Sequence, residues 1–130
     1  MTVLLVDVAN VVGSRPDGWW RDRAGATTRL LHRLAGLPGT APAGPDGTPL
    51  PVTALVAVVE GRAREVEAPP GVRLVRAAGS GDDALADLAT ELAEEDDDLL
   101  VVTADRGLRE RLPRTARVAG PGWLLAAADR

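Results

Sequence analysis

Apolar residues along the chain are gathered in short runs, and longer polar or turn-rich segments separate these runs. Three mostly apolar runs, rich in valine and leucine, span residues 3–6, 52–59 and 99–103. Continuous runs of this kind are typical of strands that are buried on both faces of a parallel sheet. Residues 72–76 and 117–119 have shorter patterns, and we expect them to form two further strands.

The segments between these runs favour helices. In residues 22–35 the alanine and leucine side chains fall on one side of a helix. Helices are also expected over residues 82–94, over 106–112, where a proline follows, and over 121–128, which has a proline near its first turn. Strands that alternate with helices predict an α/β fold around a central, mostly parallel sheet of four to five strands.

Residues 1–130 are expected to form a single domain. The chain is 45% hydrophobic and 26% charged, and its length suffices to bury one core. Glycine and proline dominate residues 36–51. We expect a flexible surface loop there and not a linker between domains, because no second core lies on the N-terminal side of this segment.

The composition excludes several kinds of functional site. The chain has no cysteine and no lysine, and His32 is its only histidine. Thiolate metal sites, cysteine nucleophiles, lysine-containing phosphate loops and multi-histidine metal sites are therefore excluded. Three tryptophans are the only aromatic residues, so a base-stacking platform of several aromatics is excluded as well. The remaining chemistry is that of carboxylates, hydroxyls, guanidinium groups or a metal held by oxygen.

The formal net charge of −4 argues against a broad basic face for binding nucleic acid. A local patch of arginines is compatible with this charge, and clustered metal-binding acids would account for part of it. The charge alone therefore does not decide the partner.

Nothing in the sequence points to a membrane. No segment approaches the ~18 apolar residues that a spanning helix needs. The first residues lack the basic and apolar regions of a signal peptide. Together with the lack of cysteine, this leads us to expect a cytoplasmic protein, and a homodimer is compatible with all of these observations.

Polar residues follow the expected strands at the sheet edge where α/β proteins bind ligands. The residues placed after the first, second and fourth strands are Asp7, Asn10, Glu60, Thr103 and Asp105. Ligands of such sheets bind outside the carboxyl ends of the strands, so these side chains are expected to converge. Asp7 is the most informative, because it directly follows a buried run in which an unpaired charge is costly.

The helix after the 72–76 strand begins with further acids. Asp82 and Asp83 stand in its first turn, and Asp83 shares a helical face with Asp87 because four positions separate them. A cation between these two carboxylates would offset their repulsion, and hard ions such as Mg²⁺ favour oxygen ligands of this kind. We therefore expect Asp83 and Asp87 to face the site and Asp82 to be solvated.

Several of these acids also have a purely structural interpretation. Asp83 would complete a capping box with Ser80 as the N-cap of its helix, and Asp87 would simply face water. Asp105 would cap the helix that begins at the next residue. Glu60 would be a loop residue or, at most, a support for the metal ligands.

Residues 13–23 combine arginines and tryptophans close to the end of the first strand. Arg15, Arg21 and Arg23 suit bidentate contacts with phosphate, and Trp20 suits stacking on a base or sugar. The structural alternative is a loop that its tryptophans anchor to the core.

The order of these motifs resembles that of NYN domains, a PIN-like group of ribonucleases that includes YacP-type proteins. Residues 7–10 (DVAN) are similar to the opening D-x-x-N of the group, and residues 58–61 (VVEG) resemble the end of its second strand. Residues 79–83 (GSGDD), with Asp87, resemble its acidic helix start, and residues 101–105 (VVTAD) resemble its strand that ends in T-x-D.

The resemblance implies a three-layer PIN-like (Rossmannoid) sandwich and cleavage of phosphodiester bonds, most simply in RNA, by a metal-activated water. The residues implied to hold one or two Mg²⁺ or Mn²⁺ ions are Asp7, Asp83, Asp87 and Asp105. Asn10 and Thr103 would orient water, substrate or an acid, while Asp82 and Glu60 would support the set.

One departure from this pattern leaves a second function open. PIN domains often carry a further acid shortly after T-x-D, where this chain has Arg106 and Arg109. The alternative is therefore a catalytically inactive PIN-like module that binds RNA or a protein partner. A phosphatase of the haloacid-dehalogenase type is disfavoured, because it needs Asp-x-Asp after the first strand and Ala9 stands at that position.

Overall fold

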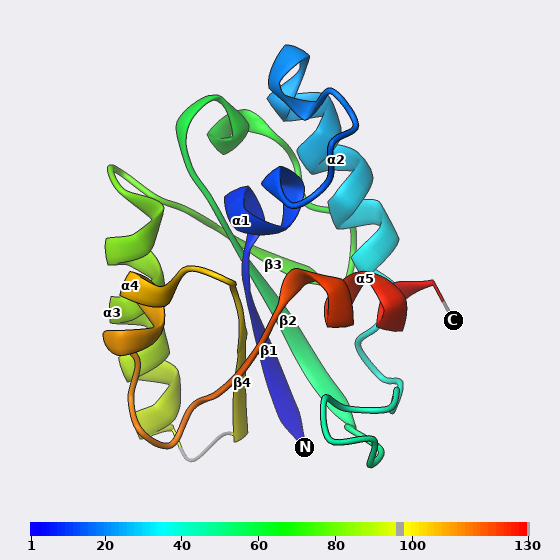
Figure 1. The fold of residues 1–130 in the computed structure, drawn as a ribbon, viewed down its shortest axis with the longest axis vertical. Coiled ribbons are helices and arrows are strands. Elements are labelled where there is room, and N and C mark those ends of the chain that lie inside the picture. Colours follow the sequence, from blue (N-terminus) through cyan, green and yellow to red (C-terminus); the bar gives the residue numbers. More distant parts are fainter. Residues whose placement is uncertain (96–97, 130) are drawn as a thin grey trace.

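A five-stranded sheet, all of whose strands are parallel, forms the centre of the protein in a computed structural model that describes residues 1–95 and 98–129 (Figure 1). The strands are β1 (Thr2–Asp7), β2 (Val52–Val59), β3 (Val72–Arg76), β4 (Asp98–Val102) and β5 (Arg117–Ala119). Their order across the sheet is β3-β2-β1-β4-β5. The chain thus winds outward from β1 in both directions, and the winding reverses between β1 and β4.

Helices cover both faces of this sheet. One face packs on α1 (Val8–Gly13), α2 (Arg23–Leu34) and α5 (Pro121–Ala128), and the other packs on α3 (Gly81–Glu94) and α4 (Arg106–Glu110) (Figure 1). Two short 3-10 segments, Trp19–Arg21 and Gly61–Glu65, lie in the connections after α1 and β2. The expected α/β class is confirmed, with a sheet that is parallel throughout.

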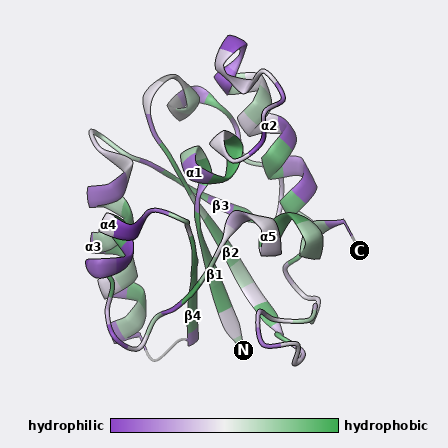
Figure 2. Cartoon of the chain, viewed as in Figure 1, coloured by the Kyte–Doolittle hydropathy of each residue, from purple (hydrophilic) through white to green (hydrophobic). Residues whose placement is uncertain are grey.

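The core consists of two layers, one on each side of the sheet. Along β1, Leu4 and Val6 pack into the layer under α1, α2 and α5, while Val3 and Leu5 pack into the layer under α3 and α4. Side chains alternate between the faces of a strand, and both faces are covered, so β1 is apolar at consecutive positions. Figure 2 shows the same concentration of hydrophobic residues along the strands.

Helix α1 was not predicted from the sequence. Its six residues include three valines and a glycine, which are weak helix formers. The helix is fixed by tertiary contacts, because Val8 and Val11 are buried and the side chain of Asp7 caps the first turn. The helix starts directly after β1, and Asp7 is therefore the last residue of the strand and the N-cap of the helix at once.

The Gly- and Pro-rich segment 36–51 lies at the surface, as expected, but it is folded against the body of the protein. Leu37 and Leu50 are buried at its two ends. A bridge pairs Ala43 with Pro49, and the indole nitrogen of Trp123 on α5 donates a hydrogen bond of 3.0 Å to the carbonyl of Ala43. The segment is thus a hydrogen-bonded turn that α5 holds in place.

None of the helices in the described part of the chain is both long and apolar enough to cross a membrane.

Candidate functional site at the switch point of the sheet

The winding of the sheet reverses between β1 and β4, and two polar side chains meet there. Asp7 ends β1 and Thr103 directly follows β4; both are buried, with 6% and 0% of their surface exposed. The Thr103 hydroxyl donates a hydrogen bond of 2.9 Å to Oδ2 of Asp7. Connections leave β1 and β4 toward opposite faces at this point, and doubly wound sheets bind ligands in the crevice at such a switch point.

Further hydrogen bonds join the turn after β1 to the turn after β4. The other carboxylate oxygen of Asp7 accepts from the backbone N–H of Asn10 at 3.3 Å. The side-chain oxygen of Asn10 accepts from the backbone N–H of Ala104 at 2.8 Å. The Thr103 hydroxyl oxygen accepts from the N–H of Asp105 at 3.1 Å. These bonds fix Asp7, Asn10 and Thr103 relative to one another, as expected from the sequence.

Arg109 completes the frame around Thr103 from α4. Its Nε and Nη2 atoms donate to the carbonyl oxygen of Thr103 at 3.0 and 2.6 Å. This residue occupies the region in which PIN domains often carry a further acid, and here its role is to hold the turn after β4.

Burial makes the negative charge of Asp7 costly. It raises the pKa of Asp7, and the hydrogen bonds from Thr103 and Asn10 oppose this effect without cancelling it. The negative charges of Asp82 and Glu60 raise this pKa further. The carboxylate is therefore held where a nearby cation would stabilise its charged form.

Asp82 and Asp105 extend the negative region. Burial raises the pKa of Asp82, and the charges of Asp105 and Glu60 raise it further, against a smaller opposing effect from Arg111. Asp105 also caps α4, since its Oδ1 accepts from the N–H of Leu108 at 3.0 Å. The capping interpretation of Asp105 is thus confirmed, and its charge still acts on Asp82.

Glu60 positions the start of α3. Its Oε2 accepts from the backbone N–H of Gly81 at 2.5 Å, across from the end of β2. A Cβ atom at Gly81 would lie 2.7 Å from the same oxygen, so a larger residue there would displace the Glu60 carboxylate from this hydrogen bond. Ser80, the N-cap residue, makes no capping hydrogen bond with its side chain. The prediction of a capping box formed by Ser80 and Asp83 is therefore wrong, because the first turn of α3 donates its hydrogen bond to Glu60.

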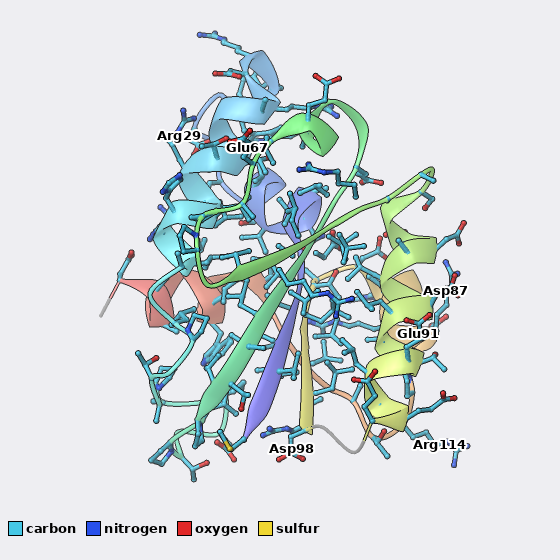
Figure 3. The ribbon with its side chains drawn as sticks, turned by 180° about the vertical axis from the view of Figure 1, so that it is seen from behind. Arg29, Glu67, Asp87, Glu91, Asp98 and Arg114 are labelled. Atoms are coloured by element: carbon cyan, nitrogen blue, oxygen red, sulfur yellow. The ribbon has the colours of Figure 1, made fainter. Side chains whose placement is uncertain are left out.

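The structure does not bring Asp83 and Asp87 to Asp7. Asp83 is exposed and forms an ion pair of 2.8 Å with Arg111. Asp87 projects from the outer side of α3, beside Glu91 (Figure 3). The spacing correctly placed Asp83 and Asp87 on one face of the helix, but that face points to solvent. Asp82, expected to be solvated, is the acid of this helix that lies near the site.

The arginines and tryptophans of residues 13–23 separate into different surroundings. The Arg23 guanidinium lies over the ring of Trp19, 5.1 Å from its centroid, and both line a pocket that Glu60 also lines. Trp20 is 56% exposed and meets Trp19 edge-on, with the ring centroids 6.0 Å apart. Trp19 is thus the half-buried tryptophan that anchors the segment, and Trp20 remains accessible.

Arg15 and Arg21 are not brought to the carboxylates. Arg15 lines a different hollow, of about 210 Å³, between α1, α2 and α5. The hydrogen bond from Arg33 lowers the pKa of Asp129 at the end of α5, and the charge of Arg15 makes a smaller contribution in the same direction. Arg21 is exposed and lines an open hollow beside Trp20. Of the three arginines expected to contact phosphate, only Arg23 therefore shares a pocket with Glu60.

The acids at this end of the sheet offer oxygen ligands for a divalent cation but do not surround one. Within residues 1–95 and 98–129, no three carboxylate or imidazole groups lie close enough together to enclose a metal ion by themselves. The donor set is nevertheless all oxygen, and neighbouring acids add to burial in raising the pKa of Asp7 and the pKa of Asp82. Mg²⁺ is usually held by one or two carboxylates, with water and substrate phosphates as the remaining ligands. Asp7 and Asp82, whose charges interact, are the two carboxylates that suit an ion bound in that way.

The raised pKa of Asp7 predicts a specific dependence of stability on pH. The folded state keeps the Asp7 proton to a higher pH than the unfolded state, whose carboxyl titrates near 3.8. The free energy of unfolding should therefore fall as pH rises from about 4 through the raised pKa. Asp7→Asn keeps a capping oxygen but removes the charge, so the Tm of this variant should exceed that of the wild type near pH 7.

Circular dichroism melting curves in EDTA, from pH 4 to pH 7, test this dependence. Each 1 kcal/mol by which the substitution raises the free energy of unfolding corresponds to an increase of about 3–5 °C in Tm for a domain of this size. The difference in Tm between variant and wild type should widen with pH, and a constant difference would contradict the assignment. Comparison of the two proteins at each pH cancels the titration of all the other acids.

The fold and the geometry together define a doubly wound α/β protein with a buried carboxylate and neighbouring acids at its switch point. A comparison with solved structures matches the chain to a crystal structure of a mutant form of Rae1 (YacP) from Bacillus subtilis. That structure is 19% identical in sequence, with a TM-score of 0.70, over 99% of this chain and 76% of that chain. The YacP-like fold expected from the motifs is therefore confirmed.

No protein-family model and no curated protein sequence matches the chain. The resemblance to NYN domains accordingly rests on the motifs and on the shared fold.

Proposed function

We propose that the protein is a divalent-metal-dependent nuclease that cleaves phosphodiester bonds in RNA. The observation that carries this proposal is the pairing of buried Asp7 with Thr103 at the switch point, next to the charges of Asp82 and Glu60. Carboxylates whose pKa is raised by burial gather at functional sites, and the switch point of an α/β sheet is where its ligands bind.

Each residue of the site has a task in this proposal. Asp7 and Asp82 would hold the metal, and the charge of Asp105 acts on Asp82 from the start of α4. Thr103 and Asn10 keep Asp7 and the adjacent turn in place through the hydrogen bonds described above. Glu60 holds the first turn of α3, and therefore Asp82, at the crevice. When bound, a divalent cation lowers the pKa of a water ligand and neutralises charge that develops on the phosphate.

RNA as the substrate is supported by the fold and by the motifs. The neighbour with the same fold is named YacP, and the motifs of this chain resemble the ribonuclease group to which YacP-type proteins belong. The net charge of −4 does not oppose this choice, because part of it comes from the acids that a cation would neutralise. Arg23 is available near the crevice for a contact with phosphate.

The second candidate is a catalytically inactive module that binds RNA or a protein. Two observations favour it: the described acids do not enclose an ion by themselves, and Arg109 is committed to the Thr103 carbonyl where PIN domains often have an acid. An inactive module would bind its partner without any requirement for a cation.

The test is cleavage of labelled single-stranded RNA, with single-stranded DNA of the same sequence in parallel. We expect cleavage of RNA in Mn²⁺ or Mg²⁺, loss of cleavage in EDTA and recovery when the cation is restored. Binding of the RNA without cleavage in any cation would favour the inactive module. Faster cleavage of DNA would contradict the choice of RNA but not the chemistry.

A further inference from the structure

A small pocket adjoins the carboxylate site on the side of α1 and α2. It has a volume of about 100 Å³, and its walls include the indole of Trp19, Arg23 and the buried Thr27. Val8 and Ala9, the two residues that follow Asp7, line it as well, and so does Glu60. The pocket is thus lined by residues that lie one or two positions after Asp7 in the chain, and also by residues at the end of β2.

We infer that this Trp19 pocket receives one unpaired nucleobase of the RNA, next to the phosphate that is cleaved. The inference rests on the proposed function and adds the substrate class, because a base that is paired in a duplex could not leave the stack to enter the pocket without unpairing. The substrate is therefore single-stranded at the cleavage site.

The chemistry of the walls matches a base better than other small groups. Valine and alanine side chains and the Trp19 indole offer the apolar and aromatic surface on which bases stack, and proteins also stack bases on arginine guanidinium planes. Thr27 and Glu60 add polar groups that can hydrogen-bond the edge of a base. A single aromatic residue suffices for one base, which agrees with the absence of a larger aromatic platform.

Trp19 is held in position before any ligand binds. The Arg23 guanidinium covers one face of its ring at 5.1 Å, and Trp20 meets it edge-on with an interplanar angle of 87°. Both contacts are favourable for aromatic rings. A wall that is already ordered loses little conformational entropy on binding, which favours a specific pocket over an adaptable surface.

The test compares RNA substrates that differ by one base. Abasic nucleotides are placed singly at each of three positions on either side of the cleaved bond, and kcat/KM is measured in Mn²⁺. Loss of one base–aromatic stack lowers affinity by about 5- to 150-fold. We expect a loss in this range at one position for the wild type and little effect at the others.

Two pocket variants should remove this discrimination. Trp19→Ala deletes the aromatic wall, and Ala9→Leu fills the pocket from an exposed helical position where leucine is well tolerated. Both variants should cleave the intact RNA about as slowly as the wild type cleaves the sensitive abasic RNA. Their kcat/KM should not fall further when the abasic RNA replaces the intact RNA. Ala126→Leu, the same change at an exposed position of α5, should keep the discrimination.

Melting curves show whether each variant is folded, and Ala9→Leu keeps the test decisive should Trp19→Ala unfold. The inference is overturned if the wild type responds equally to abasic nucleotides at every position. It is equally overturned if the discrimination survives in a folded Ala9→Leu variant.

A binding measurement separates this inference from the proposed function. Fluorescence anisotropy compares a labelled RNA trinucleotide with a fully abasic trinucleotide on wild type and Ala9→Leu. Tighter binding of the trinucleotide that carries bases by the wild type, together with loss of this preference in Ala9→Leu, supports the base-binding pocket. This result would hold even if no RNA is cleaved, and only the proposed nuclease activity would then fail. Cleavage without any dependence on a base, in contrast, leaves the nuclease standing and removes the pocket.

Discussion

Asp7→Asn should lower kcat/KM for Mn²⁺-dependent RNA cleavage by roughly 10³-fold or more, as is typical when a central catalytic group is removed. The substitution keeps the size of the side chain and one oxygen for the Asn10 N–H, so the fold should persist. It removes the negative charge that burial makes costly and that a cation would stabilise. Cleavage rates measured with labelled RNA, together with melting curves, separate the loss of activity from a loss of folding.

The matched control is Asp98→Asn. Asp98 starts β4 and lies exposed at the opposite end of the sheet from the site (Figure 3). This variant should cleave RNA at the wild-type rate. A folded Asp7→Asn protein that retains full activity would show that the switch point is not the catalytic centre.

Asp82→Asn and Asp83→Asn should have very different effects although the residues are adjacent. Asp82 lies within the electrostatic reach of Asp7 and Asp105, so its substitution should lower kcat/KM by about 10- to 100-fold, the range typical of groups that tune a metal site. Asp83 is 70% exposed and paired with Arg111. Its loss removes a surface ion pair, which contributes little stability, and should change the rate less than about twofold.

The Mn²⁺ concentration that gives half of the maximal rate provides a second measure for this pair. Asp82→Asn should raise it and Asp83→Asn should not, because only Asp82 is proposed to hold the metal. A larger effect of Asp83→Asn than of Asp82→Asn would agree with the prediction from the sequence that Asp83 is the metal ligand. It would mean that α3 presents its other face to the substrate.

The fold could be predicted from the sequence because its strands are buried on both sides. The apolar runs that became β1, β2 and β4 need no alternation when helices cover both faces of the sheet. Asp7, Asn10 and Thr103 could be placed for a similar reason, since residues at the carboxyl ends of neighbouring parallel strands must meet at one edge.

The face of α3 that points inward could not be chosen from the spacing of its acids alone. Spacing shows that Asp83 and Asp87 share a face, but only packing decides which face is buried. The buried positions Leu85, Leu88 and Leu92 carry that signal, and Asp82 borders them at helical spacing, three residues before Leu85. If the stripe of apolar residues is considered before the spacing of the acids, it identifies Asp82 as the acid of α3 that lies near the site.

Contacts between distant segments could not be predicted from local patterns. The hydrogen bond from Gly81 to Glu60 at the start of α3 joins residues 21 positions apart. Ser80 is the N-cap residue, as predicted, but the capping hydrogen bond expected from its side chain is absent. Arg15 was likewise expected at the site from its position in the sequence, while the direction of α1 carries it toward α5.

The hydrogen bonds that fix the site have a consequence for the nascent protein during synthesis. Thr103 and Asp7 are 96 residues apart, and Asn10 reaches Ala104 across 94 residues. Because β4 pairs directly with β1, the N-terminal part of the chain leaves the ribosome long before its partner strand exists. A growing chain therefore carries the Asp7 turn without the Thr103 turn until 96 further residues have been made, and the site takes its final form only after β4 has been synthesised.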